Sequence, residues 1–262
     1  MDNDDKSIGQ ILSRRDALKL LGIGSTAFLT AYASLGKKIA EAGPAPTPDC
    51  IVRPELEIGR HFVDDQLNRS DIRYDPREGT VSEGIPLALT IVVSDLSNKR
   101  CKPLEGARVD IWHCDAMGIY SDVPQRAFNT VGQQFLRGYQ LTDAKGVVRF
   151  HTIYPGWYSG RAVHIHFTIR TKATDGRDYQ FTSQFFFNDK NTDVVYTQKP
   201  YSIKGKRDTL NKDDNIYKAG GYQMVLNVHG STSGGYTSAM NIGLDLTDAK
   251  VGASDLFGGP LP

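Results

Sequence analysis

The segment VHIHFTI (163–169) contains two histidines separated by one apolar residue. In a β-strand alternate side chains point to the same face, so His164 and His166 project together while the apolar residues face the other way. Two neutral imidazoles at this spacing can bind one Zn, Cu, Fe or Ni ion. The pair alone does not decide the matter, because two surface or hydrogen-bonding histidines produce the same pattern.

Two tyrosines are candidates to join this pair. Tyr158 and Arg161 belong to the turn YPGWYSGR (154–161), which leads into the histidine strand, and Tyr120 lies in IWHCDAMGIYSD (111–122). A phenolate is a hard, charged oxygen donor, and its proton is lost readily only beside a strong Lewis acid such as Fe(III). Two phenolates with two imidazoles would therefore favour ferric iron over Zn or Cu. For each tyrosine the alternative is a core or rim aromatic with a satisfied hydroxyl.

Short apolar segments rich in β-branched residues predict the strands that position these side chains. Helical periodicity is absent from segments such as PLALTIVV (86–93) and ARVDIWH (107–113). Segments 138–142 and 146–153 flank the turn DAKG, which predicts a hairpin with a positive φ at Gly146. The remaining predicted strands are 163–170, 179–187, 222–228 and 239–246. Together they predict an all-β fold, an antiparallel β-sandwich.

The composition fits one globular domain and excludes a disordered or fibrous chain. The sequence has 262 residues, of which 39% are hydrophobic and 10% aromatic. Thirty-one Lys and Arg residues nearly balance 30 Asp and Glu residues, and a net charge of +1 offers no basic field for a nucleic-acid partner. The polar segment 188–219 is predicted to be a long functional loop or lid within the domain.

The first 42 residues have the layout of an export signal. The pair Arg14-Arg15 precedes a run of small and apolar residues, 17–35, and resembles the twin-arginine signal, whose cargo is exported already folded. Cleavage after Ala42 would leave a Pro-rich linker, 43–49, and a single domain, 50–262; an earlier small-x-small site is the alternative. We therefore expect a periplasmic or extracellular protein with no stable membrane span after signal removal, or else an uncleaved anchor.

Several motifs, in order, resemble those of the intradiol ring-cleavage dioxygenases, which are non-haem ferric enzymes. The similarity extends from about residue 50 to residue 246 and looks closest to the short, exported branch of that family. It is carried by IWH (111–113), GIYS (118–121), FLRG (135–138), TD (142–143), PGWY (155–158) and RAVHIHF (161–167). The resemblance implies a β-sandwich of the intradiol dioxygenase type, which cleaves a catechol-type ring with O2 to a muconate-type diacid.

The same resemblance implies roles for six residues. Two tyrosines and two histidines would hold Fe(III): Tyr120, Tyr158, His164 and His166. Tyr158 and His166 would be the axial pair, and the departing Tyr158 phenolate would serve as a base for the diol. Arg161 and Gln184 would face the substrate, where the permanent charge of Arg161 stabilises negative charge on the ring. We expect a small aromatic diol and O2 as partners; the oligomeric state is left open.

One segment departs from the family pattern. Where the family commonly has Thr-Glu-Gly-Pro followed by Tyr or Phe along the substrate pocket, this chain has ELEIGRHFVD (55–64), and only Gly59 is retained. Arg60 and His61 replace an apolar, rigid pair. Two outcomes are open: the pocket accepts a carboxylated or otherwise polar ring, or the segment lies outside the site. We expect the histidines outside the ligand set to be structural or rim residues: His61, His113, His151 and His229.

Three cysteines in an exported protein allow one disulfide and one leftover thiol. Three pairings are possible. We expect Cys50 to pair with Cys101, and Cys114, which follows a core strand, to be a buried and inert thiol.

Two other functions stay open at this point. One is an exported β-sandwich binding protein without catalysis, which predicts no tightly bound metal. The other is a Zn or Cu enzyme that uses the His-x-His pair, which predicts a colourless or blue protein. The ferric hypothesis instead predicts visible absorption from phenolate-to-iron charge transfer.

Overall fold

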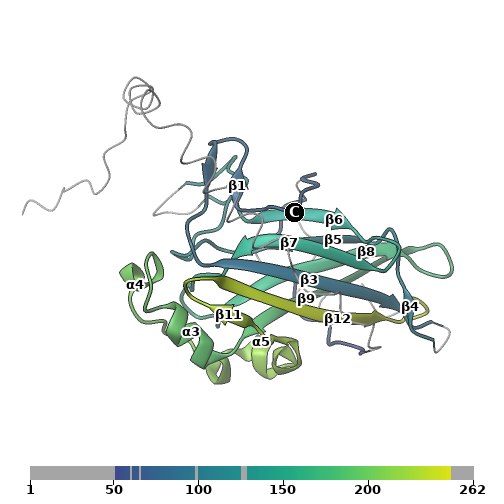
Figure 1. Ribbon diagram of the computed structural model, residues 1–262. Helices are drawn as coiled ribbons and strands as arrows, with labels where there is room; N and C mark the ends of the chain where they lie inside the picture. The colour runs from purple at the N-terminus through teal and green to yellow at the C-terminus, as the bar shows by residue number, and fades with distance from the viewer. Residues whose placement is uncertain (1–50, 60, 65, 98–99, 125–128, 249–262) are drawn as a thin grey trace, which may run out of the picture. The chain divides into compact units, whose positions relative to one another are not determined.

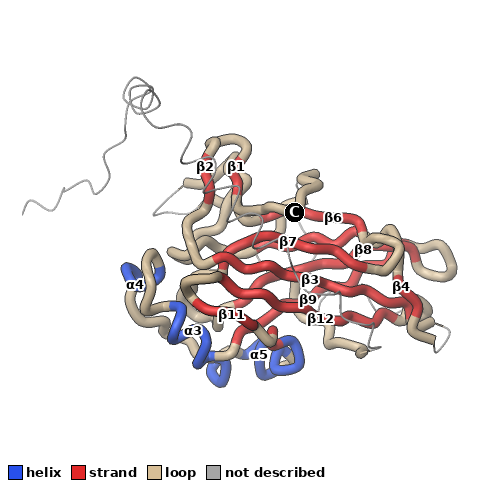
Figure 2. Tube along the Cα trace, in the orientation of Figure 1, coloured by secondary structure: helices blue, strands red, loops and turns tan. Residues whose placement is uncertain are grey.

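The structure, a computed structural model, describes residues 51–59, 61–64, 66–97, 100–124 and 129–248. The predicted signal (1–42), the linker (43–49) and Cys50 lie outside the described residues, so these assignments stay predictions. Two β-sheets pack face to face in a sandwich (Figure 1), and strands far outnumber helices along the chain (Figure 2). The predicted all-β sandwich is confirmed.

The first sheet carries the histidine strand in its interior. Its order is β10 (Val225–Leu226), β9 (Asp178–Phe187), β8 (His164–Lys172), β5 (Arg108–Trp112) and β6 (Arg137–Leu141). On β8, His166 lies opposite Trp112 of β5 on one side and opposite Gln184 of β9 on the other. Because residues in register point to the same face, the sheet places these three side chains together.

The second sheet closes the sandwich. Its order is β11 (His229–Ser231), β12 (Gly235–Leu244), β3 (Pro86–Asp95) and β4 (Lys102–Pro103). Strand β7 (Val147–Ile153) pairs with β3 on the same edge as β4, opposite β12. The pairs β12–β3 and β10–β9 are parallel, so the sandwich is not wholly antiparallel. A separate two-stranded ribbon joins β1 (Tyr74–Asp75) to β2 (Thr80–Val81).

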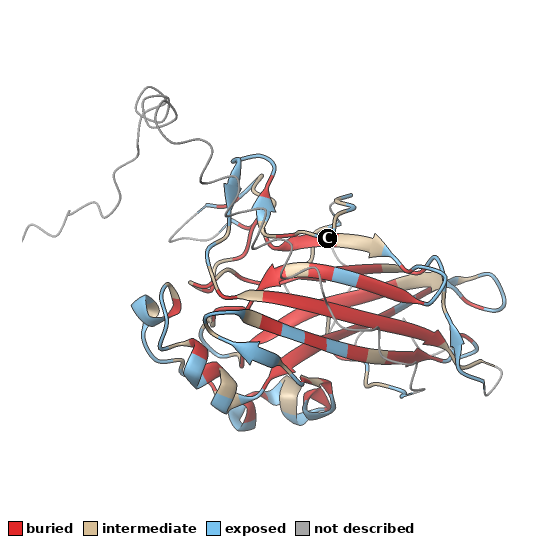
Figure 3. Cartoon of the chain, in the orientation of Figure 1, coloured by how far each residue is buried: buried red, intermediate tan, exposed pale blue. Residues whose placement is uncertain are grey.

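The core lies between the two sheets, where burial is continuous over residues 87–94 of β3 and 164–169 of β8 (Figure 3). On β8 the side chains of Ile165, Phe167 and Ile169 are fully buried in it, and Phe167 stacks on Phe185 of β9 with 4.2 Å between ring centroids. The period of two along a strand then directs the alternate residues of β8 to the outer face. The predicted division of this strand into an apolar face and a histidine face is therefore correct.

Strands β6 and β7 do not form the predicted hairpin. The turn between them is present: Gly146 has a φ of 73°, and the Asp143 carboxylate accepts hydrogen bonds from the N–H groups of Lys145 and Val147. However, β6 pairs with β5 in the first sheet, whereas β7 pairs along its whole length with β3 in the second. The turn connects the two sheets, because each strand pairs along its length with a strand other than its neighbour across the turn.

The segment 188–219 was predicted to be a long loop or lid. It instead forms a series of short helices at one end of the sandwich (Figure 2). They are α3 (Asp189–Val195), α4 (Tyr201–Lys204), the 3-10 turn η1 (Asn211–Asp213) and α5 (Asn215–Lys218). Each is too short to show helical periodicity in the sequence. A further 3-10 turn, η2 (Gly221–Met224), replaces the start of the strand predicted at 222–228, of which only β10 is observed as strand.

The cysteines agree with prediction as far as they are described. Cys101 is disulfide-bonded, and Cys114 is a buried free thiol whose pKa is raised by burial. Because Cys50 lies outside the described residues, its pairing stays a prediction. No helix within the described ranges is long and apolar enough to span a membrane.

Candidate metal centre

Four predicted ligands converge beside the outer face of β8. His164 Nε2 lies 2.9 Å from Nε2 of His166 and 3.2 Å from the hydroxyl oxygen of Tyr158. The ring of Tyr120 lies 5.7 Å from that of Tyr158 and 6.2 Å from that of His166, measured between centroids. The structure therefore brings together two phenols and two imidazoles from three separate segments.

The hydrogen bonds of His164 fix its tautomer. Its Nδ1 lies 2.6 Å from the carbonyl oxygen of Ala162, and a carbonyl can only accept, so Nδ1 carries the proton. Nε2 is left with a free lone pair directed at the cluster. A histidine that donates through one nitrogen and presents the other is the usual arrangement of a metal ligand.

Tyr120 is the most unusual member of the group. Its side chain is 1% exposed, and its hydroxyl makes no hydrogen bond with any described residue. A buried hydroxyl without a partner costs about 1–3 kcal/mol. A bound ligand, such as a metal ion, would give this hydroxyl oxygen the partner that the described protein atoms do not supply.

Burial favours the neutral form of all four groups. It raises the pKa of Tyr120 well above its ordinary value and that of Tyr158 to about 12. It lowers the pKa of His164 to about 3, with a further contribution from Arg161, and that of His166 well below its ordinary value. A cation among these donors would lower the pKa of the two tyrosines, because it stabilises phenolates. It would keep the pKa of the two histidines low, because it binds imidazoles through their lone pairs.

The donor set fits ferric iron. Two oxygen donors that become anionic and two imidazoles match a hard, highly charged ion. Within the described part of the chain, no group of three or more His, Cys, Asp or Glu residues is placed to hold a metal. A metal at this place therefore depends on the phenols, which a Zn or Cu site would not need.

Packing holds the ring of His166 in place. On one side the indole of Trp112 stacks on the imidazole with 5.0 Å between centroids and planes 6° apart. Gly59, at a φ of 78°, approaches the same ring so closely that a Cβ would lie 2.6 Å from Cε1 of His166. Any larger residue at position 59 would displace this imidazole, which accounts for the glycine.

The two tyrosines are carried by turns that pack on each other. In the first turn the Asp115 carboxylate accepts hydrogen bonds from the N–H groups of Met117 (2.9 Å) and Ile119 (2.8 Å). Lys204 of α4 joins the turns: its Nζ donates to the carbonyl oxygens of Met117 (2.5 Å) and Trp157 (2.6 Å). Helix α4 thus fixes the separation between the segments that bear Tyr120 and Tyr158.

Replacing Lys204 with methionine is expected to lower the free energy of unfolding by about 1–3 kcal/mol, because two carbonyl oxygens lose a charged donor. Thermal unfolding of the purified variant measures this. Lys172→Met is the matched control, since the Lys172 side chain is 68% exposed and should give a change within about 0.5 kcal/mol. Equal stability of the two variants would show that Lys204 does not join the turns.

A second layer of residues orients Arg161 and Gln184. Arg161 donates from Nε to the Asp214 carboxylate (2.8 Å) and from Nη2 to Oε1 of Gln184 (2.5 Å). Gln184 in turn donates to the carbonyl oxygen of Glu57 (2.8 Å). Asp214 also accepts from the N–H of Ala162 (2.8 Å), two residues before His164 along the chain. The six predicted site residues therefore form one connected group.

Comparison with known proteins identifies this arrangement. A family model described as Dioxygenase (Dioxygenase_C) matches residues 68–228, which is more than half of the chain and contains all six site residues. The solved structure of an intradiol ring-cleavage dioxygenase from Tetranychus urticae is similar, with 30% identity and a TM-score of 0.65, over 76% of this chain and 97% of that one. The chain belongs to the intradiol ring-cleavage dioxygenase family.

More distant members of the intradiol family agree. The protocatechuate 3,4-dioxygenase beta chain of Burkholderia cepacia is 32% identical over 37% of this chain and 45% of its own length. Catechol 1,2-dioxygenase 1 of Acinetobacter lwoffii is 27% identical over 54% of this chain and 48% of its own. The chain thus spans about half the length of these curated relatives. The structure of catechol 1,2-dioxygenase from Acinetobacter sp. ADP1, at 19% identity and a TM-score of 0.53, shares the fold.

Sequence reasoning missed two residues of this site, Asp214 and Lys204. Asp214 holds Arg161 and also caps α5 by accepting from the N–H groups of Ile216 and Tyr217. An Asp before a short helix is a capping signal, but α5 is too short to be recognised. Lys204 carries no local signal. His61, expected to be structural or at the rim, stacks on Tyr120 with 4.3 Å between centroids, so the divergent segment lies at the site and not outside it.

Proposed function

We propose that this protein is an Fe(III)-dependent intradiol dioxygenase that cleaves a catechol-type aromatic diol with O2. The observation that carries the proposal is the convergence of two phenols and two imidazoles on one point. Tyr120, Tyr158, His164 and His166 would hold the ion. The ion supplies the Lewis acidity that lets a diol bind as its dianion and react with O2 directly.

The chain's own groups would handle protons and charge. Tyr158 is half-buried whereas Tyr120 is fully buried, so Tyr158 is the phenol with room to move and to accept a hydroxyl proton of the diol at its Oη. Arg161, kept in place by Asp214 and Gln184, would stabilise negative charge on the ring. Trp112 and Gly59 exclude water from the side of His166.

The overall reaction needs no external reductant. The bond between the two hydroxylated ring carbons breaks, both atoms of O2 enter the product, and a muconate-type diacid forms. A metal-free binding protein would instead keep the Tyr120 hydroxyl buried without a partner, at a cost of about 1–3 kcal/mol. Export by a twin-arginine-type signal, to the periplasm or the outside of the cell, stays part of the proposal.

Oxygen uptake tests this function. The purified, iron-loaded protein is supplied with catechol, hydroxyquinol, protocatechuate or 4-methylcatechol, and both O2 consumption and the product spectrum are recorded. We expect one O2 consumed per diol and a colourless muconate-type acid from at least one substrate. A yellow semialdehyde, the product of extradiol cleavage, or no uptake with any of the four diols would overturn the proposal.

A further inference from the structure

Residues 56–59 and 61–64 lie beside the four-donor cluster and are called the strap below. At one end, the N–H of Leu56 donates to the carbonyl oxygen of Thr182 on β9 (2.9 Å). Further along, Gly59 contacts His166, and Phe62 packs on Trp112 with 5.0 Å between centroids. The strap therefore contacts His166 directly through Gly59 and, through Phe62, the indole that stacks on His166.

His61 lies in the middle of the strap, against both phenols. Its ring stacks on that of Tyr120 with 4.3 Å between centroids and planes 26° apart, and stands edge-on to Tyr158 at 6.3 Å. Both His61 and Tyr158 are half-buried, whereas Tyr120, His164 and His166 are at most 2% exposed. His61 and Tyr158 are thus the more exposed members of this group, and a ring bound at the donors would lie next to His61.

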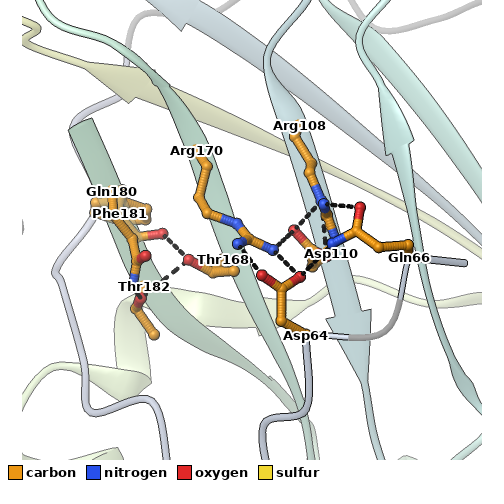
Figure 4. A network of polar contacts seen from close by, with 9 residues as sticks. All are labelled: Asp64, Gln66, Arg108, Asp110, Thr168, Arg170, Gln180, Phe181 and Thr182. Atoms are coloured by element: carbon orange, nitrogen blue, oxygen red, sulfur yellow. Dashed lines mark hydrogen bonds and ion pairs between the residues drawn. The ribbon is translucent and has the colours of Figure 1, made fainter. Parts of the chain in front are cut away.

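A network of ion pairs fixes the other end of the strap (Figure 4). The Asp64 carboxylate accepts from Nη2 of Arg108 (2.9 Å) and from both Nη1 and Nη2 of Arg170 (2.9 and 3.0 Å). Asp110, buried on β5, binds the same two guanidinium groups at 2.7 and 3.0 Å. Bidentate arginine–carboxylate pairs in a network are geometrically specific. We call Asp64, Arg108, Asp110 and Arg170 the clamp.

The clamp positions the strap relative to the metal-binding strand. Arg170 belongs to β8, the strand of His164 and His166, and Arg108 belongs to β5, the strand of Trp112. The guanidinium of Arg170 also lies 5.6 Å above the ring of Phe62. Asp64 lies three residues beyond His61, so the ion pairs of Asp64 restrict the position of the His61 imidazole. The clamp therefore helps to hold that ring beside Tyr120.

We propose that His61, held by the clamp, recognises a hydrogen-bonding substituent, hydroxyl or carboxylate, on the ring of the substrate. The inference rests on the proposed function and deepens it. An imidazole offers one N–H donor and one acceptor, and a ring substituent with an oxygen can bind either. A methyl group in the same place would desolvate the imidazole without replacing its hydrogen bonds. Arg137, whose Nη1 donates to the carbonyl oxygen of His61 (3.4 Å), is a nearby cation and favours an anionic substituent further.

Equilibrium binding tests the proposal without turnover. Resorcinol, 3-hydroxybenzoate and 3-methylphenol each lack the adjacent hydroxyl pair and differ in the second substituent. We expect the purified full-length protein to bind resorcinol or 3-hydroxybenzoate about tenfold more tightly than 3-methylphenol, measured by calorimetry. His61→Phe, which keeps the stacked ring, should reduce this preference to less than about threefold, and His61→Gln should restore it. No preference in the parent protein, or an unchanged one in His61→Phe, overturns the proposal.

The role of the clamp is tested by the same ratio of affinities, that of resorcinol or 3-hydroxybenzoate to that of 3-methylphenol. Asp64→Asn should lower the preference toward the His61→Phe value. Asp178→Asn, which removes an exposed ion pair with Lys172 on β8, should leave it unchanged. A preference that Asp64→Asn leaves intact would overturn the role of the clamp. Failure of the proposed function looks different: the protein would show the binding preference but cleave no diol.

Discussion

The Tyr120→Phe variant is expected to lose its bound iron and its visible absorption while folding at least as stably as the parent protein. The substitution removes one oxygen atom, and that oxygen makes no hydrogen bond with any residue in the described ranges. The metal-free variant therefore loses no hydrogen bond. Its free energy of unfolding should lie within about 0.5 kcal/mol of that of the metal-free parent, or above it. The affinity for iron should fall by on the order of 100-fold or more, because one of four donors is gone. Metal analysis and thermal unfolding of the metal-free proteins measure the two effects.

Tyr154→Phe is the matched control and should behave in the opposite way. Tyr154 is also fully buried, but its hydroxyl bonds to that of Thr192 at 2.7 Å, away from the donor cluster. Its loss should lower the free energy of unfolding by about 1 kcal/mol and leave iron content and colour unchanged. Retention of full iron and colour by Tyr120→Phe would refute the assignment of Tyr120 as a ligand.

The Asp214→Asn variant is expected to lose about 3 kcal/mol of folding free energy and most of its turnover, yet to retain the four metal donors. The Asp214 side chain is 0% exposed and is paired with Arg161, so its replacement leaves a partly buried guanidinium without its countercharge. Arg161 would then no longer be held at a fixed place beside the substrate. Chemical denaturation and steady-state kinetics measure the two losses. The account of Asp214 fails if turnover drops while stability and the pH dependence below are unaltered.

The pH dependence of stability provides a second signature of Asp214. Burial alone would raise the pKa of this carboxyl, but Arg161 and the N–H groups that it accepts from outweigh burial and hold the pKa below its usual range. A depressed pKa in the folded state means that the stabilisation is complete above the unfolded value, near 3.9, and is lost as the pH falls through the folded value. The parent protein should therefore lose more stability than Asp214→Asn on acidification from about pH 5 to about pH 3. Parallel curves would show that Asp214 is not the responsible group.

The features that could be predicted from the sequence are those with a local pattern. The alternation in 163–169 predicts which face of β8 is buried, and the turn at Gly146 is correctly placed. The six site residues were predicted from a resemblance between ordered motifs, and the structure brings them together. In contrast, the prediction of a hairpin between β6 and β7 was wrong, because a local turn does not reveal which sheet each strand joins.

The features that escaped prediction depend on contacts between distant residues. Asp64 meets Arg108 and Arg170 across 44 and 106 positions of the chain, and Asp214 meets Arg161 across 53. In a sequence, an Asp or Arg that is solvated at the surface cannot be distinguished from one that forms part of an ion-pair network. His61 was expected at the rim, and only the fold shows that its ring lies on that of Tyr120.

Anomalous diffraction from crystals of the iron-loaded protein tests the central claim most directly. Data collected on both sides of the iron absorption edge would locate the ion without reference to activity. The account predicts one peak, present above the edge and weak below it, within bonding distance of Oη of Tyr120 and Tyr158 and Nε2 of His164 and His166. A strong peak at any other place, or four donors without an iron peak among them, would contradict it.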